Sequence, residues 1–168
     1  MVQVQVLGVA LDAKQQHIVL LKPLFEHLGE SRVLPIWIGE QEATSILIGA
    51  SGAHAPRPLS HDLMKTLLDT LDAGVAEVEV QRIDGGTFYA AITLTGPAGR
   101  HVVDARPSDA IALAVRMGAP LFVADEVLEE AGIPGSLIDE SAADDEAEDE
   151  LAEFKKFIEG VDPEDFRG

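Results

Sequence analysis

The chain contains no cysteine. Disulfide bonds, thiolate zinc sites and a cysteine nucleophile are therefore excluded, and nothing marks the chain as a secreted protein. Aromatic residues are also scarce, at 5% of 168 residues. The hydrophobic content of 46% is nevertheless enough to bury the core of one domain of this length.

Long apolar runs are missing as well. No stretch approaches the ~20 apolar residues that span a bilayer. The first residues, MVQVQVLGVALDAKQQ, lack the basic segment and the following apolar segment of a secretory signal. We therefore expect a cytoplasmic protein that does not contact a membrane.

Basic residues are few, because 12 Lys and Arg stand against 30 Asp and Glu, which gives a formal net charge of -18. This charge argues against a nucleic-acid partner, since phosphate backbones are bound by basic patches. The charge is unevenly distributed, however. Residues 139–168 contain 13 acidic and 3 basic residues, whereas residues 1–138 contain 17 and 9. More than half of the net negative charge therefore lies in a short C-terminal segment.

Hydrophobic patterns predict five strands in the first 95 residues: VQVQVLGVAL, HIVLLKPL, VLPIWIG, VAEVEVQRI and TFYAAITLT. The last two are joined by Asp84-Gly85-Gly86, a strong hairpin signal. Two further short strands are expected at 101–104 and 121–124. The order of strands and helices does not alternate regularly. The sequence therefore predicts a single α+β domain over 1–133, with a mixed, largely antiparallel sheet and packed helices.

Helical spacing is found in EQEATSILIGASGA, in residues 61–74 and in residues 107–117, the last apolar nearly all round and therefore expected to be buried. Ser60 is predicted to cap the second of these helices and Gly74 to close it. Its predicted buried stripe consists of Leu63, Leu67 and Leu71, widened by Met64 and Leu68.

The C-terminal segment differs in composition from the domain. Residues 134–150 include IDESAADDEAEDE, which predicts a disordered acidic linker. Further on, apolar residues fall on one face of a predicted amphipathic helix over 151–168: Leu151, Phe154, Phe157, Ile158 and Val161. This helix is a candidate docking element for a protein partner.

Two predicted helix starts share an Arg-Pro sequence followed by a hydroxyl and an acid, RPLSHD at 57–62 and RPSD at 106–109. Helix N-termini present unpaired N–H groups, so an adjacent Arg favours phosphate binding. Asp62 and Asp109 satisfy the same helix dipoles and would repel a phosphate. Local chemistry therefore favours a capping role. The alternative is a phosphate clamp formed by Arg57, Arg106 and Ser108.

A divalent cation between carboxylate and phosphate would remove that repulsion, because Mg²⁺ is typically held by one or two carboxylates plus substrate oxygens. The candidate ligands for Mg²⁺ or Mn²⁺ are Asp62, Asp104 and Asp109, with Glu40 and Glu42 as further candidates. His61 is expected to be exposed in the first turn of its helix. There it is either a solvated side chain or a general base or metal ligand.

The few aromatic residues include Trp37 and the pair Phe88-Tyr89. Aromatic rings often hold single-stranded nucleic acid by stacking on its bases. In a chain with so few aromatic residues, packing in the core is the favoured interpretation.

Three stretches taken together carry a family resemblance: LPIWIGEQEATSI at 34–46, RPLSHDLMKTLL at 57–68, and FYAAITL with VVDARPSDAIALAVRMGAPLFV between 88 and 123. They resemble the bifunctional nuclease family, and the match runs in order across residues 1–133. The resemblance implies cleavage of DNA and RNA. Its densest stretches, RPLSHD and DARPSD, contain the clustered acids, His and Arg.

Two functions are compatible with these observations. The first is a hydrolase, a metal-assisted phosphodiesterase with His61, Asp62, Arg106 and Asp109 as the catalytic set. In it Arg57, Arg106 and Ser108 bind the phosphate, Asp62, Asp104 and Asp109 hold one or two ions, and His61 moves protons. The alternative is a non-enzymatic regulatory or protein-interaction module with the same fold. Net charge supports the second function and the resemblance supports the first, which is favoured.

Self-association is expected in either case. Short edge strands and the apolar VLPIWIG predict a homo-oligomer, with a dimer as the favoured size.

Overall fold

The computed structural model describes residues 1–25 and 32–138. Its strands are β1 (Val2–Leu11), β2 (His17–Pro23), β3 (Arg32–Ile38), β4 (Gly74–Asp84), β5 (Thr87–Gly96), β6 (Gly99–Ala105), β7 (Leu121–Val123) and β8 (Ile133–Pro134). Its helices are α1 (Glu40–Ser51), α2 (Ser60–Thr70), α3 (Pro107–Met117) and α4 (Asp125–Ala131), followed by a 3-10 turn at Gly135–Leu137. The predicted C-terminal helix and most of the predicted linker lie outside the described residues.

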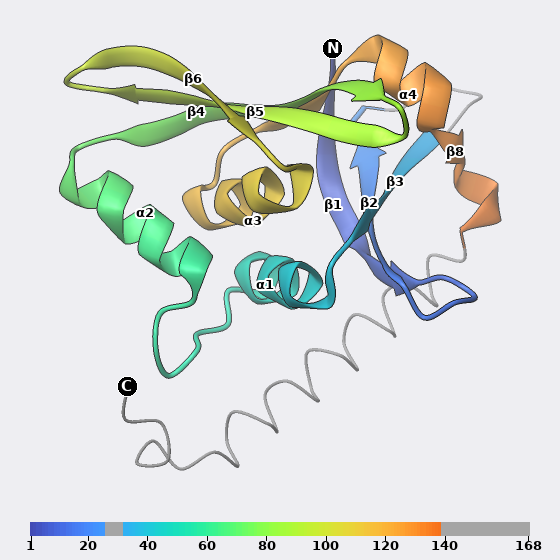
Figure 1. The fold of residues 1–168 in the computed structure, drawn as a ribbon, viewed down its shortest axis with the longest axis horizontal. Coiled ribbons are helices and arrows are strands. Elements are labelled where there is room, and N and C mark those ends of the chain that lie inside the picture. Colours follow the sequence, from blue (N-terminus) through green and yellow to red (C-terminus); the bar gives the residue numbers. More distant parts are fainter. Residues whose placement is uncertain (26–31, 139–168) are drawn as a thin grey trace.

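The strands form one mixed sheet in the order β6-β5-β4-β7-β1-β2-β3-β8 (Figure 1). Only β4 and β7 run parallel within this sheet, and the other neighbouring pairs are antiparallel. The three-residue β7 lies between two antiparallel groups, because it pairs with β1 on one side and with β4 on the other. This arrangement confirms the predicted α+β fold with a mixed, largely antiparallel sheet.

The helix α3 is the centre of the helical layer. It packs against β4 and β5 and lies between the sheet and α1, with α2 beside it (Figure 1). Small and aliphatic side chains on all its sides are buried: Ala110, Ile111, Ala112, Leu113 and Ala114. This confirms the burial predicted for a helix that is apolar nearly all round.

The helix α2 turns a different face to the core than predicted. Leu63, Leu67 and Leu71 are exposed rather than buried, and so is Met64. The buried side chain of α2 is instead His61, while Leu68 packs only partly against the core. The prediction was wrong because periodicity shows that a helix has an apolar face but does not show which face the neighbouring helices cover.

The ends of α2 were also displaced in the prediction. The N-cap is Leu59, so Ser60 is the first helical residue, and the Leu59 backbone N–H donates to Asp62 Oδ2 over 2.8 Å. The third helical residue thus accepts a hydrogen bond from the backbone of the cap residue, and no serine side chain caps the helix. Gly74 begins β4 rather than closing the helix.

Candidate functional site

His61 connects α2 to both neighbouring helices. Its side chain is 6% exposed, with Nδ1 at 2.7 Å from Ser45 Oγ in α1 and Nε2 at 3.0 Å from Asp109 Oδ1 in α3. The expectation that this imidazole is exposed was wrong, because the polar side of α2 faces α1 and α3. The starts of α2 and α3, which contain the two Arg-Pro sequences, therefore contact each other through His61 and Asp109.

The chemistry of these partners fixes the proton positions on a neutral His61 ring. An ionised carboxylate only accepts hydrogen bonds, so Nε2 carries the proton and donates it to Asp109. Nδ1 is then an acceptor and receives the hydroxyl proton of Ser45. The Ser45 oxygen in turn accepts a hydrogen bond from Arg116 Nη2 over 3.1 Å. With a neutral ring, the hydrogen bonds thus run in one direction, from the buried Arg116 through Ser45 and His61 to Asp109.

Asp109 also holds Arg106, the last residue before α3. Arg106 Nε donates to Asp109 Oδ2 over 2.7 Å, while its Nη2 donates to Asp109 Oδ1 over 3.1 Å and to Glu42 Oε1 over 3.2 Å. Burial raises the pKa of Asp109, but the hydrogen bonds from Arg106 and His61 outweigh it, and the pKa lies below its ordinary value. Asp109 is therefore ionised at neutral pH and acts as an anchor for Arg106.

Asp62 belongs to the opposite, buried end of the network. Arg116 is 5% exposed, and its Nε donates to Asp62 Oδ1 over 2.8 Å while its Nη1 donates to the Ala112 carbonyl over 2.8 Å. Burial raises the pKa of Asp62, but the hydrogen bonds from Arg116 and the Leu59 N–H have the larger, opposite effect. The pKa of Asp62 therefore lies below its ordinary value. Asp62 thus neutralises a buried guanidinium and caps α2.

Sequence reasoning missed Ser45 and Arg116. Each stands within an otherwise apolar helical pattern, which is the signal that could have revealed a buried polar pair. Gly49 gives a second indication, because a Cβ there would lie 2.7 Å from Arg116 Nη1. A glycine in mid-helix allows α1 to pass this close to the Arg116 side chain.

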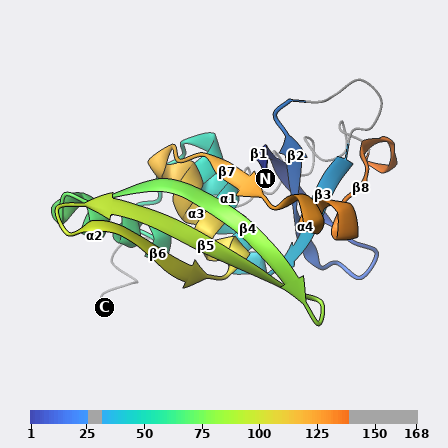
Figure 2. The same ribbon diagram turned by 90° about the horizontal axis from the view of Figure 1, so that it is seen from above.

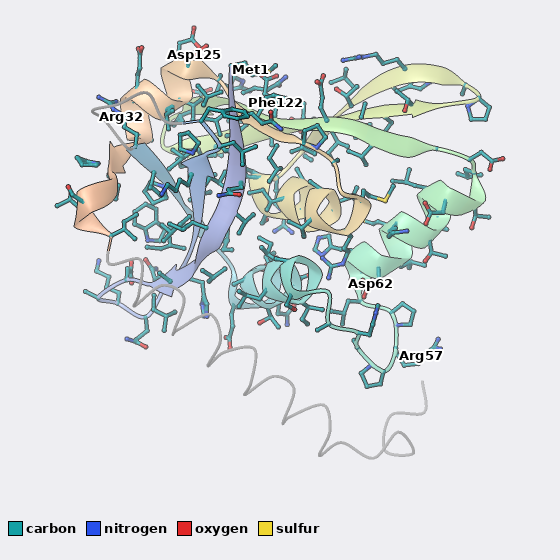
Figure 3. All side chains as sticks on the ribbon, turned by 180° about the vertical axis from the view of Figure 1, so that it is seen from behind. Met1, Arg32, Arg57, Asp62, Phe122 and Asp125 are labelled. Carbon is teal, nitrogen blue, oxygen red and sulfur yellow. The ribbon has the colours of Figure 1, made fainter. Side chains whose placement is uncertain are left out.

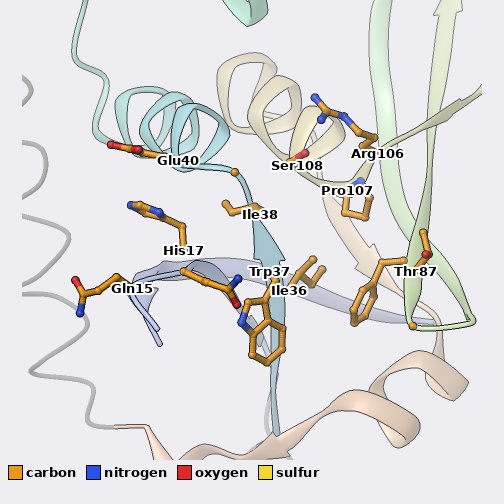
Figure 4. A pocket seen from close by; sticks show the side chains of 14 residues that line it. Gln15, His17, Ile36, Trp37, Ile38, Glu40, Thr87, Arg106, Pro107 and Ser108 are labelled. Atoms are coloured by element: carbon orange, nitrogen blue, oxygen red, sulfur yellow. The ribbon is translucent and has the colours of Figure 1, made fainter. Parts of the chain in front are cut away.

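The exposed end of the network borders a pocket of about 730 Å³. Five segments form it: the β1–β2 turn, the end of β3, the start of α1, the β4–β5 turn and the start of α3 (Figure 4). Arg106, Pro107 and Ser108 line one side, and Glu40, Trp37 and Phe88 are among the other lining residues. We call this the Trp37 pocket.

Trp37 is 54% exposed, so the prediction that it packs in the core was wrong. Its Nε1 donates a 3.0 Å hydrogen bond to Asp12 Oδ2, which restrains the indole ring at the edge of the pocket. Phe88 also lines the pocket but packs partly against the core. Tyr89 lies elsewhere, beneath the Arg82 guanidinium at 3.6 Å from its ring centroid.

Two further predicted site residues, Arg57 and Asp104, do not line this pocket. Arg57 is exposed in the loop before α2, where its side chain projects outward (Figure 3), and it is not among the residues that line the pocket. Asp104 is exposed on β6.

Within residues 1–25 and 32–138, no three His, Asp or Glu side chains are grouped to hold a metal ion. Asp62, Asp104 and Asp109 therefore do not form a preformed metal centre. The requirement for Mg²⁺ or Mn²⁺ stays a prediction.

Comparison with known proteins connects this network to a family. The model of the bifunctional nuclease domain matches residues 23–136, which include every residue from Glu42 to Arg116 described above. The chain belongs to the bifunctional nuclease domain family. The family resemblance seen in the sequence is thereby confirmed.

Three relatives of this bifunctional nuclease domain protein show how far the similarity extends. Two Mycobacterium tuberculosis proteins, described as uncharacterized proteins MT1877 and Rv1829, are each 41% identical over 168 residues, which is 98% of both chains. Bifunctional nuclease 2 of Oryza sativa subsp. japonica is 29% identical over 99 residues, covering 56% of this chain and 30% of the rice protein. In the described part of the chain, no helix is both long enough and apolar enough to cross a membrane.

Proposed function

We propose that this protein is a nuclease that hydrolyses phosphodiester bonds of single-stranded DNA and RNA in the Trp37 pocket. The observation that carries the proposal is the Arg106 guanidinium, held by two carboxylates at the start of α3 and bordering a pocket that also contains an exposed Trp37. A fixed guanidinium suits a phosphate, and an accessible indole suits an unpaired base. Membership of the bifunctional nuclease domain family supports the same conclusion.

Arg106 is suited to bind and polarise the phosphodiester. Its side chain is 65% exposed, and its Nη1 forms no hydrogen bond with the described residues. The pKa of Arg106 is raised mainly by its hydrogen bond to Asp109, so it stays charged. A charged donor that is already oriented stabilises the negative charge that develops on the phosphoryl oxygens during attack by water.

The buried residues then act through Arg106. His61 and Ser45 are each 6% exposed, so we assign them a positioning role behind Asp109 rather than contact with substrate. Holding a functional side chain to within a fraction of an ångström requires such a second layer of hydrogen bonds. Asp62 acts one step further away, by neutralising Arg116.

The test is cleavage and binding of single-stranded DNA and RNA oligonucleotides by the full chain. Arg106→Gln should lower kcat/KM by about 100- to 1,000-fold, as expected for loss of a donor to the transition state. Arg82→Gln is the matched control, since it removes the same charge from an exposed strand position outside the pocket, and should stay within about twofold. Equal activity of wild type and Arg106→Gln would exclude the Trp37 pocket as the catalytic site.

The second candidate function is a regulatory or protein-interaction module. The exposed apolar side chains of α2 favour it, because Leu63, Leu67 and Leu71 have no neighbour in the described fold that covers them. Pure wild-type protein that binds oligonucleotides or proteins but cleaves neither DNA nor RNA, with or without Mg²⁺ or Mn²⁺, would establish this function instead.

A further inference from the structure

The strand β6 is an open edge of the sheet. Among the described residues it pairs with β5 alone, on one side, and residues 99–104 are all exposed (Figure 2). An edge strand has unpaired N–H and C=O groups along its free side, which makes it a template for another strand. In β6 this free side is seven residues long and contains two exposed valines, Val102 and Val103.

The charges of β6 are arranged symmetrically around one residue. Arg100, Val102 and Asp104 alternate along the strand, and therefore lie on one face of the sheet, with Thr95, Thr93 and Ala91 as their neighbours on β5. If a second β6 pairs antiparallel about Val102, each Arg100 lies opposite Asp104 of the partner subunit and the two Val102 residues face each other. On the other face, His101 lies opposite Val103 of the partner subunit.

The helix α2 presents a second exposed apolar surface near this edge. It lies below the end of the sheet where β5 turns into β6 (Figures 1 and 2), and four of its large apolar side chains are exposed: Leu63, Met64, Leu67 and Leu71. Rows of exposed apolar side chains of this length are typical of a protein interface rather than of a solvated surface.

We propose that two copies of this chain form a two-fold symmetric dimer by antiparallel pairing of their β6 strands about Val102, with the apolar row of α2 covered by the partner. A two-fold axis uses the same surface on both copies, and the sequence Arg100-His101-Val102-Val103-Asp104 is complementary to itself in this register. The dimer is independent of the proposed nuclease function, because the Trp37 pocket contains none of these residues.

Charge reversal tests this register. Sedimentation of the full chain should show a dimer for wild type and monomers for Arg100→Asp and Asp104→Arg, because each variant places like charges opposite each other twice. We expect the dissociation constant of each variant to rise about 10- to 100-fold. An equimolar mixture of the two variants should dimerise again, since every cross-strand pair in the heterodimer is then attractive.

Arg100→Asp also breaks an ion pair within its own chain, to Glu77. The control is Arg82→Asp, which changes the net charge equally and likewise breaks an exposed ion pair, to Asp84, but lies on the inner strand β4. It should leave the dimer intact. A monomeric wild type, single variants that remain dimeric, or a mixture that stays monomeric would each overturn the proposal.

A cysteine provides a second measurement that does not alter charge. Residues opposite each other in an antiparallel pair have Cα atoms about 4.5–5.5 Å apart, within the span of a disulfide. Because the chain has no cysteine of its own, Val102→Cys should form a covalent dimer on mild oxidation. The matched Gln81→Cys, exposed on β4, should not. Equal cross-linking of both variants would contradict pairing at Val102.

Discussion

His61 Nε2 lies 3.0 Å from Asp109 Oδ1, so a buried imidazole in the first turn of α2 supports a carboxylate in the first turn of α3. The same carboxylate receives two hydrogen bonds from Arg106. The orientation of an exposed guanidinium therefore depends on a buried side chain. This relationship determines what substitutions at each point of the network should do.

His61→Ala should lower kcat/KM by about 10- to 100-fold, the usual loss when a supporting residue behind a functional group is removed. If His61 acts through Arg106, the same substitution in an Arg106→Gln background should cost little more, because the two effects are then not additive. Kinetics of the four proteins and circular dichroism of each would measure this. Independent, additive losses would show a direct role for His61 in the reaction.

Asp109→Asn should keep the fold while releasing Arg106, because the amide no longer attracts the guanidinium or accepts hydrogen bonds on both atoms. We expect a loss of stability of about 1–2 kcal/mol and a loss of activity close to that of Arg106→Gln. Thermal melts and oligonucleotide cleavage would be compared. Full activity of Asp109→Asn would show that Arg106 is held sufficiently by Glu42.

Asp62→Asn should act on stability. Arg116 is buried and would lose its charged partner, so we expect the free energy of unfolding to fall by about 2 kcal/mol. The control Asp69→Asn breaks an exposed pair with Lys65 and should cost under about 0.5 kcal/mol. Urea unfolding measures both. A large activity loss with unchanged stability would support the catalytic role predicted for Asp62 from the sequence.

Acid should weaken the same network. The pKa values of Asp62 and Asp109 are lowered from 3.8 in the folded chain, so their stabilising contribution is present above about pH 4 and is lost as the pH falls through the lowered values. Urea unfolding between neutral pH and pH 2 should therefore show a decline that is shallower in the Asp62→Asn/Asp109→Asn double variant. An identical pH dependence in both proteins would contradict this assignment.

Metal removal distinguishes an ion that binds together with the substrate from an ion that is part of the folded protein. Because no three ligands are grouped in the described residues, EDTA should leave the melting temperature unchanged. If an ion enters with the substrate and is bound partly by phosphate oxygens, EDTA should still lower cleavage. Calorimetric melts and cleavage assays, each with and without added Mn²⁺, would measure the two effects. Destabilisation by EDTA would indicate a structural metal instead.

The sequence was informative where a pattern depends on local chemistry. Alternation along β4 and β5 and the Asp84-Gly85-Gly86 turn predicted a hairpin, and the helical spacing of EQEATSILIGASGA predicted α1, which ends at Gly52 with φ of +68°. These features depend on residues that are close along the chain, so nothing distant could override them.

Predictions that depended on distant packing were less reliable. The burial of His61 follows from contacts with Ser45 and Asp109, which are 16 and 48 residues away. The exposure of Leu63 and Leu67 has the same cause, because the polar side of α2 is held against α1 and α3 by this network. No property of residues 60–70 alone distinguishes the two orientations of the helix.

The three-residue strand β7 also has a consequence for how the chain is made. During synthesis, β1 to β3 and β4 to β6 emerge first as two separate antiparallel groups, and the strand that joins them ends only at Val123. Val2 must then find Val123, a partner 121 positions away, before the sheet is continuous. Closing such a long loop is slow compared with hairpin formation. The two groups of strands therefore cannot become one continuous sheet on the ribosome until residue 123 has left the exit tunnel.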